Sequence, residues 1–343
     1  MLLARISRRA AFQRSLQSAP VCHQARNFNS SAISAENTSS TRMSSISKDA
    51  TPLAIDPRLP QRSWDSHMHI LEESYPLSSS AQYKPKHFHT LQDWEAFHPT
   101  VGIPNIVFVQ PSIYGNDNDC LLDGLRALGP DRARGVVTFD PTDPRLKDQL
   151  PEWHALGVRG VRVNLKSVGR VMDQDELTQT LQAYADVIRP LGWVIQVYLP
   201  MVMVPLLEAV VPTLGGVRVI VDHMGHPPVK ELQEYSATGN VASIPGLDAL
   251  IRLLRAGSTY TKISGAYRMS GAADGFSDVL PLARELIRIA PDKVVFATDW
   301  PHTRFEGLDI RPWIGAVLDL CQGDEAEKLF RTNAEVLWGV RDE

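Results

Sequence analysis

The sequence predicts an α/β fold, a single (β/α)8 TIM barrel domain preceded by an N-terminal extension that we expect to be disordered. Eight short apolar runs rich in β-branched residues alternate with segments of helical periodicity over about 280 residues, the repeat number and size of such a barrel. A doubly wound sheet would instead carry a glycine-rich turn after its first strand. The segment DSHMHILEE at 65–73 has no such turn, so the barrel is favoured.

The expected strands are short runs in which valine, isoleucine and aromatic residues dominate, a composition that favours an extended backbone. NIVFVQ and WVIQVYL are two examples. In chain order, the eight strands are expected at 64–70, 105–110, 134–139, 158–163, 193–199, 217–221, 259–264 and 293–297.

The expected helices lie between these strands and place apolar residues three or four positions apart. The clearest is DELTQTLQAYADVIRP, whose apolar stripe is stopped by Pro190. Two connections, 71–89 and 224–245, show no such period and are expected to be long irregular loops, which grip substrate in this fold. The helices are expected at 118–128, 144–155, 175–190, 201–211, 246–256, 278–290 and 310–320, with a final one at 324–337.

The N-terminal residues differ in composition from the rest of the chain. Residues 1–35 contain five arginines and many serines, and no acidic residue precedes Glu36. This composition is typical of a mitochondrial transit peptide, so we expect the protein in the mitochondrial matrix; a disordered basic tail is the alternative. RNFNSS at 26–31 resembles a matrix-processing site. Residues 36–62, rich in Ser, Thr and Pro, predict a flexible linker, and 63–343 form the barrel domain.

Charge and composition exclude several classes of partner. Without the expected transit peptide the formal net charge falls from −4 to −9, because that segment holds five arginines and no acidic group. A negative chain is unfavourable for binding nucleic acid or an anionic membrane surface. No apolar run reaches the ~18 residues that would span a bilayer. The three cysteines have no motif spacing, so neither a disulfide framework nor a zinc knuckle is predicted.

Polar side chains follow the predicted strands where a barrel places its chemistry, at their C-terminal ends. His67 and His69 lie two positions apart in SWDSHMHI, and alternate residues of a strand point to the same face. We therefore expect both imidazoles to project into one site. Further polar residues at strand ends are expected at the same mouth: Ser112, Arg162, Tyr198, His223, Arg268 and Asp299.

The motifs SWDSHMHI, VDHMGHP and ATDWPHT together resemble the amidohydrolase superfamily and, more narrowly, its 2-pyrone-4,6-dicarboxylate lactonase group. VQPSIYGNDN, GVRGVRVN and ISGAYRMS are similar to that group as well. The resemblance covers the chain from about residue 60 to residue 338. It implies a barrel hydrolase that opens a small carboxylated lactone and that works in the catabolism of aromatic compounds.

The superfamily usually holds one or two divalent metals, and part of that ligand set is missing from this sequence. The fourth strand ends in RVNL, without a bridging group, and Tyr198 stands where the fifth strand would supply a histidine. The lactonase group works without a metal, so the resemblance implies that no cofactor is required. If a single zinc or manganese ion is bound, the expected ligands are His67, His69 and Asp299, because nitrogen and carboxylate ligands suit zinc.

A metal-free lactonase still needs an activated water and stabilisation of the developing oxyanion. Asp299 is the expected general base. His67, His69 and His223 are expected to polarise the carbonyl and to donate protons, which makes them hydrogen-bond donors rather than ligands.

The expected substrate is a small carboxylated lactone, because arginine binds carboxylates through a bidentate fork. Arg162 and Arg268 match the carboxylate-binding positions of the lactonase group. Tyr198 and Ser112 match its smaller polar contacts. Arg170 corresponds to a second arginine after the fourth strand, although it arrives about two residues late, with a nearby lysine as a rival.

Two other functions stay open at this point. A metal-dependent amidohydrolase or a decarboxylase of a small carboxylic acid would use the same barrel. A non-catalytic barrel that binds an acidic metabolite is the third alternative. The set of histidines with Asp299 argues against it, because binding an acid needs arginines but no base.

Overall fold

The computed structural model describes residues 55–340 of the 343-residue chain. The expected transit peptide and most of the expected linker lie outside the described residues. Within the remaining part of that linker, the chain forms turns beside the barrel. Arg58 pairs there with Asp56 and with Asp319 of a barrel helix, each at 2.6 Å.

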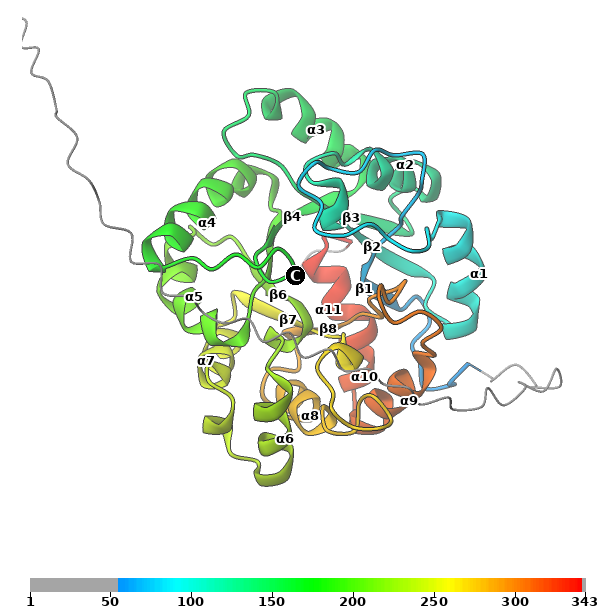
Figure 1. Cartoon of the computed structure of the whole chain (residues 1–343), viewed down its shortest axis with the longest axis vertical. Helices are drawn as coiled ribbons and strands as arrows, with labels where there is room; N and C mark the ends of the chain where they lie inside the picture. The colour runs from blue at the N-terminus through cyan, green and yellow to red at the C-terminus, as the bar shows by residue number, and fades with distance from the viewer. Residues whose placement is uncertain (1–54, 341–343) are drawn as a thin grey trace, which may run out of the picture. The chain divides into compact units, whose positions relative to one another are not determined.

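Eight parallel strands form one sheet in the order of the sequence, which confirms the predicted barrel (Figure 1). The first and last strands meet through backbone hydrogen bonds from Asp299 N to His67 O at 3.0 Å and from His69 N to Trp300 O at 2.8 Å. The strands are β1 (Trp64–Met68), β2 (Asn105–Val109), β3 (Ala133–Val137), β4 (Val158–Asn164), β5 (Val194–Tyr198), β6 (Val219–Val221), β7 (Thr259–Ile263) and β8 (Val294–Phe296).

Helices surround the barrel, and all eight expected helices are present. No helix within residues 55–340 is long and apolar enough to cross a membrane. The α-helices are α1 (Leu91–Val101), α2 (Asp119–Leu128), α3 (Leu146–Leu156), α4 (Gln174–Ile188), α5 (Val204–Val210), α6 (Val229–Thr238), α7 (Leu247–Ala256), α8 (Leu280–Ile289), α9 (Arg311–Leu320), α10 (Glu325–Glu327) and α11 (Asn333–Leu337). Shorter helical turns are η1 (Ser112–Tyr114), η2 (Arg189–Leu191), η3 (Met201–Met203), η4 (Val211–Thr213), η5 (Asp222–Gly225), η6 (Val241–Ser243), η7 (Ala266–Arg268) and the π-helical η8 (Lys328–Thr332).

Two further helices were not predicted. α1 begins with a capping box, in which the Thr90 side chain accepts from the Asp93 backbone and Asp93 accepts from the Thr90 backbone. Pro99 lies inside α1 and obscures its period in the sequence. The expectation of an irregular loop at 224–245 was wrong in part, because α6 occupies its middle.

The barrel interior changes from apolar to polar along the strands. Val194, Ile220 and Tyr260 belong to an interior apolar cluster, which α11 (red in Figure 1) and the adjoining Trp338 complete. Two residues further along the same strands, the side chains are polar or charged, since alternate residues share a face. The interior therefore offers a packed base and a charged upper layer. That upper layer comprises Gln196, Asp222 and Lys262, all fully buried.

Candidate active site

A cavity of about 450 Å³ opens at the C-terminal ends of the strands. This is the end at which barrels of this type carry their active sites. Seven of the residues singled out in the sequence line it, and they come from seven different strand ends and the loops that follow them. They are His69, Ser112, Arg162, Tyr198, His223, Arg268 and Asp299.

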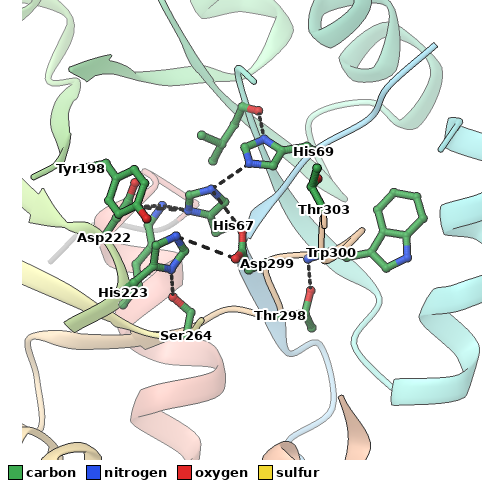
Figure 2. A network of polar contacts seen from close by, with 12 residues as sticks. His67, His69, Tyr198, Asp222, His223, Ser264, Thr298, Asp299, Trp300 and Thr303 are labelled. Carbon is green, nitrogen blue, oxygen red and sulfur yellow. Dashed lines mark hydrogen bonds and ion pairs between the residues drawn. The ribbon is translucent and has the colours of Figure 1, made fainter. Parts of the chain in front are cut away.

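His67 in β1 and His69 just after it project together, as predicted (Figure 2), with ring centroids 4.9 Å apart. An irregularity in the pairing of β1 with β2 contributes to this arrangement. From the pair Asp65–Ile106 to the pair Met68–Phe108, β1 advances by three residues and β2 by two. Such a bulge changes the direction of the side chains that follow it. His67 Nε2 lies 3.3 Å from His69 Nε2, and His69 Nδ1 donates to the Val109 carbonyl at 2.6 Å. His69 lines the cavity, whereas His67 lies fully buried beneath it.

Asp299 follows β8 with a backbone φ of 63°, in the left-handed region that few residues other than glycine, asparagine and aspartate adopt. Its Oδ2 accepts hydrogen bonds from Tyr267 OH at 2.8 Å and from Arg268 Nε at 2.5 Å. Its Oδ1 lies 3.8 Å from His67 Nε2. One carboxylate oxygen is therefore held in place, and the other lies among the imidazoles.

The charges around Asp299 keep it ionised. Burial alone would raise the pKa of this carboxyl, but the Arg268 guanidinium and the neighbouring imidazoles hold it well below its usual range. Burial lowers the pKa of His223, and it lowers the pKa of His69 to about 3. At neutral pH the site thus combines an ionised carboxylate with neutral imidazoles.

His223 reaches the site through a tight turn after β6. His223 and Met224 have φ of 51° and 52°, so the chain folds back on itself at η5. His223 Nδ1 lies 2.8 Å from Ser264 Oγ, and its Nε2 lies 3.9 Å from Asp299 Oδ2 (Figure 2). Beside it, Tyr198 OH bonds His226 Nδ1 at 2.9 Å. The His223 Nε2 atom faces the carboxylate across the cavity.

A buried ion pair lies under the histidines. Lys262 Nζ is 3.1 Å from Asp222 Oδ1 and 3.1 Å from His67 Nδ1. Gln196 Nε2 donates to Asp222 Oδ2 at 3.0 Å. Burial lowers the pKa of Lys262 to about 8, and the Asp222 carboxylate limits that decrease. Lys262 is therefore still largely an ammonium at neutral pH.

The cavity is strongly cationic. Four of its lining residues are permanent or near-permanent cations, Arg162, Lys166, Arg268 and Arg304, against the single carboxylate of Asp299. The Arg162 side chain is buried, and its Nη1 donates to the Gln110 carbonyl at 2.8 Å, while its Nε has no hydrogen-bond partner among residues 55–340. Buried donors without a partner are rare in proteins and often await a ligand or water. The cavity suits an anion.

Arg170 does not reach this cavity, in contrast to the expectation from the sequence. Its guanidinium is exposed and pairs with Glu176 at the start of α4. It lines a neighbouring cavity of about 240 Å³ that shares Arg162 and Ser112 with the first. The loop after β4 turns back at Arg170, whose backbone N donates to Leu165 O at 2.9 Å, so Lys166 faces the site in its place.

Three groups of the kind that bind metals converge in the site: one atom each of His67, His223 and Asp299, all within 4.8 Å of one another. The ligand set expected from the sequence named His69 in place of His223. In kind, two imidazoles and a carboxylate suit zinc. Their surroundings do not, because Asp299 already accepts from the Arg268 guanidinium and Lys262 lies against His67. Two cations beside the ligands oppose a further divalent cation.

Several residues of the site were not predicted to take part. Lys262 is the main one. Its position inside the apolar run TYTKIS could have indicated a buried ion pair, because an unpaired buried lysine is rare. The sequence places Tyr267 at a strand end and Arg304 near the mouth without giving either a role; in the structure Tyr267 bonds Asp299 and Arg304 lines the cavity. The positions of Tyr267 and Arg304 depend on the paths of the loops after β7 and β8.

The barrel and the histidine–aspartate cluster at its mouth define a hydrolase of the amidohydrolase type. The chain matches the amidohydrolase family over residues 64–340 and belongs to it. It is 29% identical over 289 residues to 2-pyrone-4,6-dicarboxylate hydrolase of Comamonas testosteroni, covering 79% of this chain and 86% of the relative. It is 28% identical over 271 residues to 4-sulfomuconolactone hydrolase of Hydrogenophaga intermedia, covering 76% and 82%.

A solved structure shares the same architecture. It is that of a Pseudomonas putida protein provisionally named a 2-pyrone-4,6-dicarboxylic acid hydrolase. The two align with a TM-score of 0.68 at 27% identity, over 83% of this chain and all of the other. The resemblance seen in the sequence motifs is thereby confirmed at the level of the family.

Proposed function

We propose that the protein hydrolyses a small lactone that carries at least one carboxylate, with 2-pyrone-4,6-dicarboxylate as the reference substrate. The observation that carries this proposal is the cavity itself, in which one ionised carboxylate lies among three histidines and faces a wall of cations. The names of the two relatives support the same class, since both are hydrolases of small anionic lactones.

The proposed mechanism uses Asp299 as the general base. Its Oδ1 takes a proton from a water molecule as the water oxygen adds to the lactone carbonyl carbon. The ring C–O bond then breaks, and the proton held by Asp299 passes to the leaving ring oxygen. The product is an open-chain hydroxy acid, or its keto form when the ring oxygen leaves as an enol. Water is the only co-reactant, so no oxidant or reductant is needed.

His223 is the proposed donor to the oxyanion. When Ser264 donates to its Nδ1, the hydrogen of the neutral ring lies on Nε2, which points towards Asp299 and the cavity. Hydrogen bonds aimed at the position where negative charge develops lower the barrier without reorganisation. His69 lines the same cavity, and His67 supports it from below.

Arg162 is the proposed anchor of the substrate carboxylate. The Nε of its buried guanidinium has no partner within the described part of the chain, and a guanidinium binds a carboxylate through two parallel hydrogen bonds. Lys166 and Arg304 add positive charge further along the same wall. Tyr198 and Ser112 line the same cavity and each offers a hydroxyl group for a hydrogen bond to the substrate. The arrangement favours a substrate with more than one anionic group.

The test is a hydrolysis assay on chelator-treated full-length protein with 2-pyrone-4,6-dicarboxylate, following the loss of pyrone ultraviolet absorbance. Rapid loss supports the proposal, including the absence of a required metal. The second candidate is a metal-dependent amidohydrolase, which the convergence of His67, His223 and Asp299 favours. Activity only after addition of zinc or manganese would select it. No hydrolysis of any carboxylated lactone under either condition would overturn the proposed function.

A further inference from the structure

Four hydrogen-bonding groups form a continuous chain from the barrel interior to the cavity. Lys262 Nζ lies 3.1 Å from His67 Nδ1, and His67 Nε2 lies 3.3 Å from His69 Nε2. His69 Nδ1 lies 2.6 Å from the Val109 carbonyl oxygen. The two contacts at the cavity end are drawn as dashed lines in Figure 2. The two ends of this chain determine where its hydrogens lie.

At the cavity end, the Val109 carbonyl can only accept, so the hydrogen between it and His69 belongs to His69 Nδ1. A neutral imidazole carries one hydrogen, and His69 Nε2 therefore presents a lone pair. Two lone pairs facing each other at 3.3 Å would repel, so the hydrogen between the rings must lie on His67 Nε2.

At the interior end, the Lys262 ammonium has three hydrogens to donate and cannot accept. His67 Nδ1 is therefore the acceptor of their hydrogen bond. Asp222 Oδ1 approaches the same nitrogen at 3.4 Å, but that oxygen makes no aligned hydrogen bond with either neighbour. Both ends of the chain thus assign His67 the same state, with its hydrogen on Nε2.

We propose that Lys262 is a positioning residue that holds His67 in the Nε2–H form and thereby prevents the His67, His223 and Asp299 cluster from binding a divalent metal. A metal ligand must offer a lone pair, and in this form His67 Nε2 has none. The proposal rests on the hydrogen bonds of the buried layer and does not depend on which lactone is hydrolysed.

The alternative state of His67 needs only a small rearrangement. With the hydrogen on Nδ1, the imidazole would donate to Asp222 Oδ1, which already lies 3.4 Å away. A carboxylate behind a histidine is the usual support of a metal-binding imidazole. Lys262 Nζ lies 3.1 Å from Asp222 Oδ1 and 3.1 Å from His67 Nδ1, so it interacts with both atoms that would form that bond. Its removal would free Asp222 to accept and His67 Nε2 to bind metal.

The first test is the imidazole nitrogen NMR spectrum of ¹⁵N-labelled full-length protein at pH 7, with the His67→Asn variant used to assign the signals. Two-bond nitrogen–hydrogen correlations distinguish a ring nitrogen that carries hydrogen from one that does not. We expect Nε2–H for His67 and Nδ1–H for His69. A wild-type spectrum with the hydrogen on His67 Nδ1 would overturn the proposal, and this readout requires no variant of Lys262.

The second test is zinc binding by the chelator-treated Lys262→Met variant. Calorimetry measures the affinity, and metal analysis measures how much zinc the protein retains. We expect the variant to bind one zinc ion per chain, roughly 10- to 100-fold tighter than wild type, the usual size of an effect from a ligand's supporting group. The added substitution His223→Ala should abolish that gain. Lys293→Met is the matched control, because Lys293 bonds Tyr260 OH and does not line the cavity.

The outcomes separate clearly. Tight zinc binding by wild type through these residues, or a folded Lys262→Met that binds zinc no better than wild type, would contradict the proposal. If Lys262→Met does not fold, Lys262→Leu takes its place in the zinc measurement, and the wild-type NMR spectrum can still overturn the proposal. Neither measurement uses catalytic activity, so a failure of the proposed lactonase function would not imitate a failure of this inference.

Discussion

Replacing Asp299 with Asn tests the proposed base with the least disturbance of the backbone. Asn is among the few residues that tolerate the left-handed φ of 63° at this position, whereas most other substitutions would add strain. The amide oxygen can still accept from Tyr267 OH and Arg268 Nε, which lie 2.8 and 2.5 Å from Asp299 Oδ2. The variant therefore keeps the shape of the site and removes the proton acceptor.

The expected loss follows from that missing function. General base catalysis contributes roughly 10²- to 10⁴-fold to a rate, which corresponds to about 2.7–5.4 kcal/mol of activation free energy at about 1.36 kcal/mol per tenfold. The hydrogen bond from Arg268 loses its charge assistance, which costs about 1 kcal/mol of folding stability. We therefore expect kcat to fall by at least a hundredfold while the protein stays folded.

The assay is the loss of pyrone absorbance, with thermal unfolding measured on the same samples. Asp140→Asn is the matched control, because Asp140 also follows a strand but is exposed, and its side chain accepts hydrogen bonds from the backbone and hydroxyl of Thr142. That variant should keep wild-type activity. A folded Asp299→Asn protein with a rate within tenfold of wild type would refute the role of Asp299 as base.

Four further predictions concern substrate binding, the pH dependence of activity, the pH dependence of stability, and targeting. Arg162→Met should lower kcat/KM roughly 10- to 100-fold, mainly through KM, because a hydrogen bond to a charged group is worth about 1.5–3 kcal/mol; Arg170→Met, at an exposed pair with Glu176, should change it by less than about twofold. Burial raises the pKa of Asp299, but Arg268 holds it well below 3.8, and burial lowers the pKa of His223, so kcat/KM should show no decrease centred near pH 6.5, the ordinary value of a histidine. A decrease centred there in the pH profile would show that a histidine with its ordinary pKa titrates. Because the folded pKa of Asp299 is depressed, its contribution to stability is present above about pH 4 and is lost as the pH falls further, which urea unfolding at two acidic pH values would measure. We also propose that residues 1–35 direct import into mitochondria, and a fluorescent reporter fused to residues 1–40 that stays in the cytosol would contradict this.

The barrel was predictable because its signal is local. Each strand is a short β-branched run and each helix an apolar stripe, and both patterns depend on residues that are neighbours in the sequence. The two helices that escaped prediction show the limit of such patterns. α1 contains Pro99, and α6 lies in a segment where few apolar residues repeat, with only Leu232 and Tyr235 buried.

The site was predictable in its membership but less so in its geometry. Strand-end positions named His67, His69, His223 and Asp299 because parallel strands of a barrel deliver their C-terminal residues to one mouth. The sequence could not show that the loop after β4 would carry Arg170 away from that mouth. Loop paths depend on contacts with distant segments, which leave no local period.

What the sequence by itself determined is therefore the alternation of strands and helices, the family and the chemical types at the mouth. The tertiary structure decided which atoms meet. The neighbouring strands β6 and β7 place Lys262 between Asp222 and His67. The physical reason is that a hydrogen bond depends on positions within a few tenths of an ångström. Such positions are set only when strands far apart in the sequence pack side by side.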